Sequence, residues 1–113
     1  ALSYSSKWEI VEATKKIIKD VQEGKIKVED INETLFSDYL ATKGIPDPDL
    51  VIRTGGEQRM SNFLLWQSAY TEFYFTDTFW PAFREEDLYA AIIDYQRRER
   101  RFGKISEQIE SEK

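Results

Sequence analysis

Polar and apolar positions recur at helical spacing near the start of the chain. The positions that share one face are Ile10, Thr14, Ile17, Ile18 and Val21. The helix they predict is preceded by a capping box at 6–9, "SKWE", with Ser6 as the N-cap, and it stops at Gly24. A second helix is predicted over roughly 29–42, with Gly44 directly after it.

Further along the chain, apolar and aromatic runs predict strands between helices. Leu50 to Arg53 is a short apolar run after "IPDPD", and 72–76, "EFYFT", is aromatic and β-prone. Leu2 to Tyr4 is a third candidate strand. Helices are predicted over Asn62 to Tyr70 and over Arg84 to Phe102, the latter acidic at its start and rich in arginine at its end. Strands thus alternate with helices, which predicts an α/β fold with a parallel sheet flanked by helices.

The number of strands is small for such a sheet. The 113 residues suffice for one small domain. An open sheet edge normally pairs with something, and the chain does not begin with methionine. We therefore expect a piece of a larger domain, or a chain that pairs with a partner.

Composition limits which side chains can carry out chemistry or binding. Cysteine and histidine are both absent, so catalysis or binding must use carboxylates, arginines, hydroxyls or a metal held by oxygen. A net charge of −5 argues against nucleic-acid binding. Neither a long apolar segment nor a signal peptide is visible, and we expect a cytoplasmic protein. Most lysines precede residue 44, whereas all arginines lie at 53 or later, where anion contacts would be made.

The segment from 53 to 61, "RTGGEQRMS", is a candidate anion site. In an open parallel sheet, ligands bind beyond the carboxyl ends of strands, where Arg53 is predicted to lie. The Gly55-Gly56 turn would let the backbone approach a ligand, and Ser61 would cap the next helix, whose free amides attract anions. Arg53, Arg59 and Ser61 could together hold a phosphate or diphosphate. Spacing alone leaves a simple polar turn, with Arg59 solvated, equally open.

Two other groups of residues could serve chemistry. Arg97 to Arg101, "RRERR", could bind an anion, although cations also stabilise a helix C-terminus and Asp94 can pair with Arg98. Glu57 and Glu72 could bind Mg²⁺, but plain solvation is the preferred interpretation for a lone glutamate. The aromatic residues from 66 to 83 could line a prenyl site; we favour a core or a subunit interface.

The segment "DLVIRTGGEQRMSNFLLWQSAYTEFYFTDTFWPAF", with the later "YQRRERRFG", resembles the cis-prenyltransferases. The likeness is most specific to their undecaprenyl diphosphate synthase branch. It spans essentially the whole chain but only the C-terminal half of a family member. The resemblance implies a domain whose C-terminal part is 1–113. It also implies condensation of isopentenyl diphosphate onto an allylic diphosphate such as farnesyl diphosphate, with Mg²⁺, to make undecaprenyl diphosphate, the cell-wall lipid carrier precursor.

The resemblance also implies roles for individual residues. Arg53, Arg59 and Ser61 match residues that bind isopentenyl diphosphate, and Glu72 matches a Mg²⁺ ligand that acts from the partner of a homodimer. The segment from 97 to 103 matches one that reaches a neighbouring subunit's active site and helps hold diphosphate. Its candidate diphosphate-binding residues are Arg97, Arg98, Arg101 and Gly103.

The sequence also departs from the family pattern. Gln58 stands where histidine is frequent, and Ala82 where aspartate often follows Trp-Pro. The N-terminal Asp-Gly-Asn-Gly-Arg-Trp motif, which carries the catalytic aspartate, is absent, so we expect the chain alone to be inactive. The alternative is a diphosphate-binding or dimerisation module without catalysis. We expect no nucleic-acid partner, and at most peripheral membrane contact through the lipid product.

Overall fold

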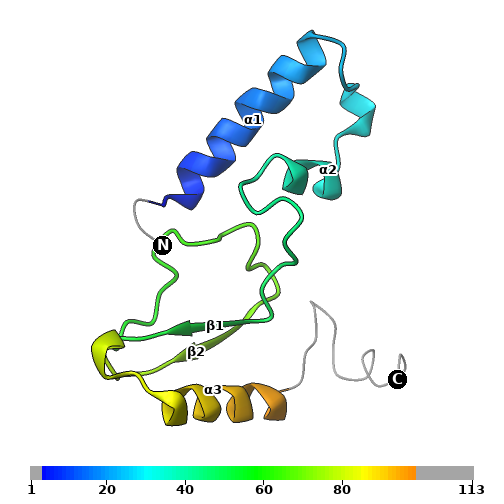
Figure 1. The fold of residues 1–113 in the computed structure, drawn as a ribbon. Helices are drawn as coiled ribbons and strands as arrows, with labels where there is room; N and C mark the ends of the chain where they lie inside the picture. The colour runs from blue at the N-terminus through cyan, green and yellow to red at the C-terminus, as the bar shows by residue number, and fades with distance from the viewer. Residues whose placement is uncertain (1–3, 99–113) are drawn as a thin grey trace. The chain divides into compact units, whose positions relative to one another are not determined.

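A computed structural model of the chain describes residues 4–98. Within that range, one compact unit consists of the residues up to Asp47 together with Met60–Trp66. The other consists of Pro48–Arg59 together with the residues from Gln67 onward. The helices and strands are α1 (Ser6–Gln22), α2 (Glu33–Asp38), β1 (Leu50–Arg53), β2 (Glu72–Phe75) and α3 (Glu85–Arg97), shown in Figure 1. Single 3₁₀ turns lie at Val28–Asp30 and Trp80–Ala82.

The start of α1 corrects the predicted capping box by one residue. Ser5, rather than Ser6, is the N-cap: its Oγ accepts a hydrogen bond from the Trp8 amide at 3.3 Å. Its carbonyl accepts from the amide of Glu9 at 3.0 Å. The Glu9 carboxylate does not reach back to the cap; it accepts from the Ala41 amide at 2.8 Å instead. A tertiary contact has therefore replaced the local one that the pattern predicted.

Asn62 completes the cap of α1. Its carbonyl accepts from the amide of Ser6 at 3.0 Å, and its Oδ1 accepts from the amide of Lys7 at 2.8 Å. Its side-chain amide donates to Ser5 Oγ at 2.7 Å. The first four amides of α1, which a helix leaves without internal partners, are thereby all satisfied within the first unit.

The predicted helix over 62–70 is wrong. Residues 61–70 form successive turns, and Ser61, Asn62 and Leu64 have positive φ angles of 50°, 62° and 48°. Left-handed backbone cannot continue a right-handed helix, and asparagine tolerates it better than most residues. The Leu65 amide also donates to Ser6 Oγ at 2.9 Å. Hydrogen bonds to the start of α1 therefore decide the conformation of this segment, although its apolar spacing predicts a helix.

The predicted helix over 29–42 is shorter in the structure. A 3₁₀ turn at Val28–Asp30 comes first, and α2 then covers only Glu33–Asp38. Asn32 is the cause of the break, because its Oδ1 accepts from the amide of Leu35 at 2.8 Å and so caps a new helix. By contrast, the prediction of a long first helix is confirmed.

The second unit confirms the predicted α/β class. β1 and β2 pair in parallel, with Leu50 opposite Glu72 and Arg53 opposite Phe75. Figure 1 shows the two strands side by side and α3 running along them. Since both strands run in the same direction, their carboxyl ends meet at one edge of the pair. The predicted helix over 84–102 ends earlier, because Arg98 has extended backbone (φ −83°, ψ 146°) and closes α3 at Arg97. The candidate strand from Leu2 lies largely outside the described residues.

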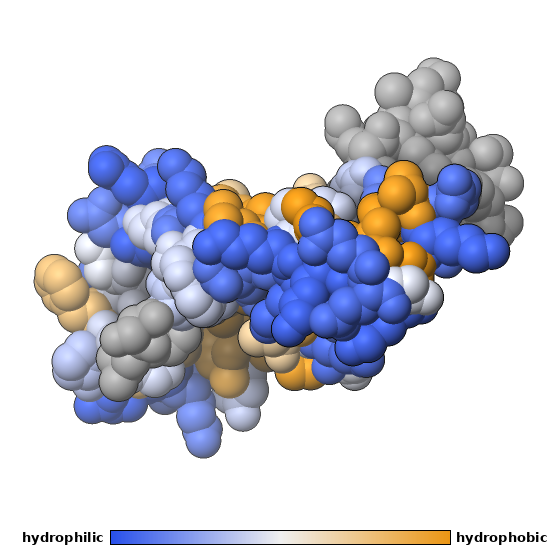
Figure 2. All heavy atoms as spheres, turned by 90° about the horizontal axis from the view of Figure 1, so that it is seen from above, coloured by the Kyte–Doolittle hydropathy of each residue, from blue (hydrophilic) through white to orange (hydrophobic). Residues whose placement is uncertain are grey.

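Few apolar side chains are buried among the described residues. The buried ones are Ala13, Ile17, Leu40 and Ala91. The apolar faces of the helices are only partly covered, because Ile18 on α1 is 52% exposed and Leu88 on α3 is 39% exposed. On the face drawn in Figure 2, apolar residues lie at the surface among hydrophilic ones. No helix in 4–98 is long and apolar enough to cross a membrane.

Candidate diphosphate site

Arg53 ends β1, as the sequence predicted. Its carbonyl accepts from the Thr76 amide at 3.0 Å, which extends the strand pairing by one bond past β2. Its side chain is half-buried, yet within 4–98 its guanidinium has no hydrogen bond or ion pair. A cation partly removed from water needs an acceptor, and Arg53 stands at the carboxyl end of β1, the edge at which ligands bind in open parallel sheets. The structure thus presents Arg53 as a cation available to an anionic ligand.

The two glycines after Arg53 serve the turn itself. Gly55 and Gly56 have φ angles of 85° and 78°, which favour glycine. Their amides donate to the carbonyls of Thr78 and Thr76, both at 3.0 Å. These amides are therefore engaged inside the protein and do not form a backbone cradle for an anion. Side chains, rather than this turn's amides, must supply the anion contacts.

Arg59 and Ser61 have different surroundings. The Arg59 side chain is 78% exposed, and its Nε lies 3.6 Å from Glu57 Oε2. An exposed pair of this kind contributes little to stability, so Arg59 can exchange Glu57 for another anion. Ser61 is exposed but belongs to the other unit, and it caps no helix, because turns follow it. The predicted helix N-terminus at Ser61 is therefore wrong, whereas Arg53 and Arg59 lie in one unit.

Arg98 is the most extensively bonded arginine among the described residues. Its Nε and Nη2 lie 2.8 and 2.6 Å from Asp94 Oδ2, which confirms the predicted pair at i and i+4. Its Nη1 donates to the Phe73 carbonyl at 2.5 Å and to Glu72 Oε2 at 3.3 Å. Partial burial lowers the pKa of Arg98, but its bonds to Asp94 and Glu72 outweigh this effect and leave the pKa raised. Arg98 thus joins the end of α3 to the start of β2.

The other candidate arginines near the C-terminus differ from Arg98. Arg97 is the last residue of α3 and is exposed. Arg101 and Gly103 lie outside the described residues. The diphosphate-binding role that the resemblance implies for this segment therefore stays a prediction, and for Arg98 it competes with an internal role.

The described residues do not by themselves make a complete Mg²⁺ site. No three His, Cys, Asp or Glu side chains in 4–98 are grouped so that they could hold a metal together. Glu72 supplies one partly buried carboxylate, and Arg98 lies 3.3 Å from one of its oxygens. Mg²⁺ often uses only one or two carboxylates and takes other ligands from substrate phosphates. Glu72 is thus chemically suitable as one ligand, but the rest of the coordination would come from elsewhere.

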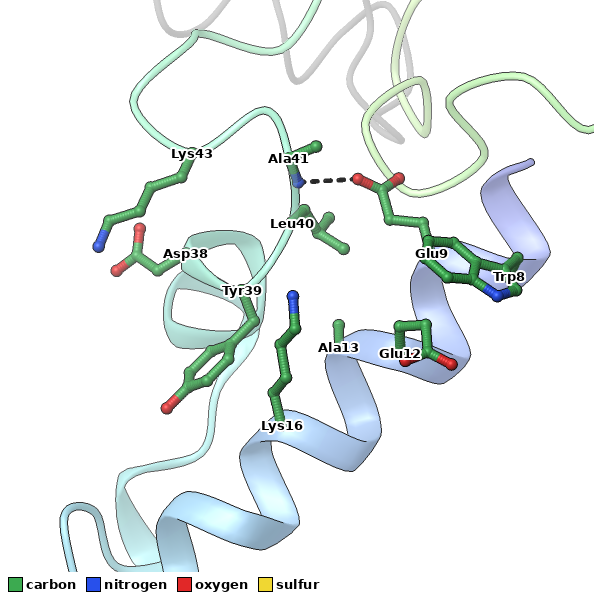
Figure 3. Close-up of a pocket in the computed structure, with 10 residues that line it drawn as sticks. All are labelled: Trp8, Glu9, Glu12, Ala13, Lys16, Asp38, Tyr39, Leu40, Ala41 and Lys43. Atoms are coloured by element: carbon green, nitrogen blue, oxygen red, sulfur yellow. Dashed lines mark hydrogen bonds between the residues drawn. The ribbon is translucent and has the colours of Figure 1, made fainter. Parts of the chain in front are cut away.

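A separate cavity lies in the first unit, between α1 and the segment after α2. Its volume is about 340 Å³, and Figure 3 shows the residues that line it. Lys16 points into it from α1, and Asp38 and Lys43 lie on its opposite side. Glu9 and the Ala41 amide are joined by the hydrogen bond drawn there. None of the residues predicted for the diphosphate site lines this cavity.

Comparison with known proteins decides the family. The sequence profile of the Prenyltransf family, the undecaprenyl diphosphate synthases, matches residues 1–103. The chain belongs to this family. Among its relatives in the family, the isoprenyl transferase of Porphyromonas gingivalis is 61% identical over 109 residues, 96% of this chain and 43% of that protein. The isoprenyl transferase of Clostridium perfringens is 60% identical over 105 residues, 93% of this chain and 42% of that protein.

Solved prenyltransferase structures agree with this assignment. Lavandulyl diphosphate synthase from Lavandula x intermedia, in complex with dimethylallyl diphosphate, matches with a TM-score of 0.87 and 46% identity. The match covers 92% of this chain and 45% of that one. A probable undecaprenyl diphosphate synthase from Campylobacter jejuni matches with a TM-score of 0.72 and 37% identity, over 92% and 46% of the two chains. The chain spans less than half the length of these prenyltransferases.

Sequence reasoning missed two features of this prenyltransferase chain. Asn62 was placed inside a helix, although it caps another helix far away in sequence. The bonds of Arg98 to Glu72 and to the Phe73 carbonyl were not predicted, although its pairing with Asp94 was. The pairing of Asp94 with Arg98 at i and i+4 was a visible signal of an internal role, whereas no local pattern marked the cap.

Proposed function

We propose that this chain carries the isopentenyl diphosphate-binding part of a cis-prenyltransferase. The complete enzyme would condense isopentenyl diphosphate onto farnesyl diphosphate and make undecaprenyl diphosphate. The observation that carries the proposal is Arg53, a half-buried guanidinium at the carboxyl end of β1 with no acceptor in 4–98. Family membership supports it, and the similar lavandulyl diphosphate synthase holds dimethylallyl diphosphate, a related prenyl diphosphate.

The chemistry of the proposed site is charge neutralisation. A diphosphate carries several negative charges, and guanidinium groups match phosphate oxygens with paired hydrogen bonds. Arg53 would bind the diphosphate as a cation already in place. Arg59 would leave its exposed partner Glu57 at little cost, and the family resemblance assigns Ser61 to the same ligand. The arginines would hold isopentenyl diphosphate while its carbon chain reacts.

The remaining parts of the reaction would need a metal and further residues. Mg²⁺, when bound, would stabilise the negative charge that develops on the departing pyrophosphate. Glu72 would contribute one carboxylate, in a homodimer as the resemblance implies. Arg97, Arg101 and Gly103 would help hold diphosphate. Because the family's aspartate motif is absent, the isolated chain is expected to bind isopentenyl diphosphate without turning it over.

A titration calorimetry experiment tests the proposed site on the 113-residue chain. We expect isopentenyl diphosphate to bind, and Arg53→Ala to weaken binding about tenfold or more, as for loss of a charged hydrogen bond. Arg59→Ala should weaken it less, since that side chain is largely exposed. Arg84→Ala is the matched control, because it removes an arginine at the start of α3 that bonds the Pro81 and Phe83 carbonyls. Equal losses in the Arg53 and Arg84 variants would refute the site.

A radiolabel incorporation assay tests the expected lack of turnover. The isolated chain is given isopentenyl diphosphate, farnesyl diphosphate and Mg²⁺. No extended prenyl product should form, because the part of the family fold that carries the aspartate motif is not in this sequence. Product formation by the chain alone would contradict the assignment of catalysis to residues outside it.

A further inference from the structure

One side of α1 carries exposed apolar side chains. Trp8 is 65% exposed, Val11 53% and Ile18 52%. They follow one another at spacings of three and seven residues, which places them in one stripe along a helix. The buried residues Ala13 and Ile17 lie on the opposite side of the helix. α1 is therefore apolar on its exposed side as well as on its packed side.

The charged residues beside this stripe are lysines. Lys7, Lys15 and Lys19 are all exposed, and they lie four or eight positions from Val11, which is the spacing of neighbours on a helix surface. The six residues together form the outer face of α1, which consists of Lys7, Trp8, Val11, Lys15, Ile18 and Lys19.

The acidic residues of α1 are engaged within the protein. The Glu9 carboxylate is buried, and the Asp20 carboxylate accepts a hydrogen bond from the Tyr39 hydroxyl. Glu12 lies 3.2 Å from Lys15, whose side chain is 69% exposed. An exposed pair of this kind is weak, so Lys15 can still contact another anion. The outer face is thus positively charged, although the chain as a whole has a net charge of −5.

A protein or a lipid surface could cover such a face. A protein would have to remove three lysines from water, which is costly unless each one finds a carboxylate. The surface of an anionic bilayer accepts both kinds of side chain. Trp and aliphatic side chains enter the boundary between headgroups and acyl chains, while lysine stems extend along it and place their ammonium groups among the anionic headgroups. The composition of the outer face therefore favours a lipid surface.

We propose that the outer face of α1 binds the surface of an anionic lipid bilayer. The helix lies along the headgroups and does not cross the bilayer. This role goes beyond the proposed function and would hold the proposed enzyme at the surface that dissolves a long prenyl product.

Co-sedimentation of the 113-residue chain with lipid vesicles tests the charged part of the face. We expect binding to vesicles of phosphatidylglycerol and phosphatidylcholine in equal parts, and much weaker binding to phosphatidylcholine alone. Lys7→Gln combined with Lys19→Gln should weaken binding about tenfold or more, because two cations leave the headgroup region. Binding of equal strength to the two kinds of vesicle, or to neither, would overturn the proposal.

A matched lysine pair is the control for net charge. Lys16→Gln combined with Lys43→Gln removes the same two charges from residues that line the cavity of the first unit. This variant should bind the anionic vesicles within about twofold of the original chain, since charges away from the contact are screened. Equal losses in the two double variants would mean that net charge alone decides binding, and the outer face would then have no specific role.

The two exposed tryptophans provide a matched test of the apolar part. Trp8→Ala should weaken vesicle binding about tenfold, because the buried area of a large side chain is lost. Trp80→Ala removes the same side chain from a position that is 71% exposed in the second unit, and it should change binding by less than about twofold. A larger loss in the Trp80 variant would place lipid contact outside α1 and contradict the proposal. Circular dichroism melts show whether the compared variants keep their fold.

The outer face and the proposed diphosphate site are tested separately. The vesicle assay contains no diphosphate, and the calorimetric assay contains no lipid. If isopentenyl diphosphate fails to bind and Trp8→Ala still weakens vesicle binding, the proposed function falls and the lipid contact stands. If the diphosphate binds as expected and the chain ignores anionic vesicles, only the lipid contact falls.

Discussion

Arg53 and Arg98 both lie beside the strand pair, and their surroundings differ. Arg53 has no acceptor in 4–98, whereas Arg98 has three. The sequence alone could not separate them, because both were candidate anion ligands at the ends of predicted elements. It did place Arg53 correctly, since an apolar run that ends on arginine marks the end of a partly buried strand. Arg98 bonds Phe73 and Glu72, which are distant from it in sequence.

At the residue scale, the Tyr4 phenol should lose its proton at a higher pH than an ordinary tyrosine. Partial burial and its hydrogen bond to the buried Glu9 carboxylate raise the pKa of Tyr4 above the ordinary 10.0. The folded state therefore favours the neutral phenol, so this contribution to stability is complete below pH 10.0 and is lost as the pH rises through the folded-state pKa. The ultraviolet absorbance of phenolate, followed during an alkaline titration, measures the shift.

Two phenylalanine variants identify the late-titrating groups. Tyr4→Phe should remove one tyrosine from the high-pH part of the absorbance titration. Tyr39→Phe should remove another, because the hydrogen bond to Asp20 raises the pKa of Tyr39 as well. Loss of an early component in the Tyr4 variant would contradict the Tyr4–Glu9 bond.

At the scale of elements, the predictions from sequence were correct where local contacts decide the conformation and wrong where distant contacts decide it. The bounds of β1 and β2 were predicted nearly to the residue, because an apolar run after prolines and an aromatic run both favour extended backbone. The segment 62–70 was predicted wrongly, since its apolar spacing suits a helix but its backbone bonds go to the start of α1. The helix over 29–42 was shortened by Asn32, whose capping ability was not weighed.

Removing the Asn62 cap should destabilise the first unit. Asn62→Ala is expected to lower the unfolding free energy by about 1–2 kcal/mol, as for loss of a helix cap, because the amides of Ser6 and Lys7 lose a positioned acceptor. Urea denaturation measures the change. Asn62→Asp keeps the Oδ1 acceptor for Lys7 and should retain most of the stability. Equal stability of the Ala, Asp and original chains would show that Asn62 does not cap α1.

At the scale of the whole molecule, the exposed apolar side chains are the main reason to expect that the chain assembles. The second unit alone exposes Trp80 at 71%, Phe79 at 69% and Tyr89 at 56%. Single exposed apolar residues are normal, but many together mark surfaces that associate. The sequence left a core and a subunit interface open for the aromatic residues from 66 to 83, and the exposure of Phe79 and Trp80 favours the interface. Assembly would suit a homodimeric prenyltransferase or a dimerisation module without catalysis.

Sedimentation velocity tests the expected assembly. We expect the chain to sediment as a dimer or larger species at micromolar concentration, and to shift toward monomer on dilution, because burial of apolar surface drives association. Addition of moderate salt should not dissociate it, since the exposed surface in question is uncharged. A clean monomer throughout the micromolar range would contradict the expectation.

The central claim is that isopentenyl diphosphate binds beside the end of β1, and the most direct measurement is a two-dimensional NMR titration of the chain with this ligand. The account predicts that the largest shifts fall on the backbone and guanidinium signals of 53–61, beginning at Arg53. The cavity of the first unit, represented by Lys16 and Lys43, is the built-in comparison. Shifts centred on that cavity, with Arg53 and Arg59 unmoved at saturation, would contradict the account.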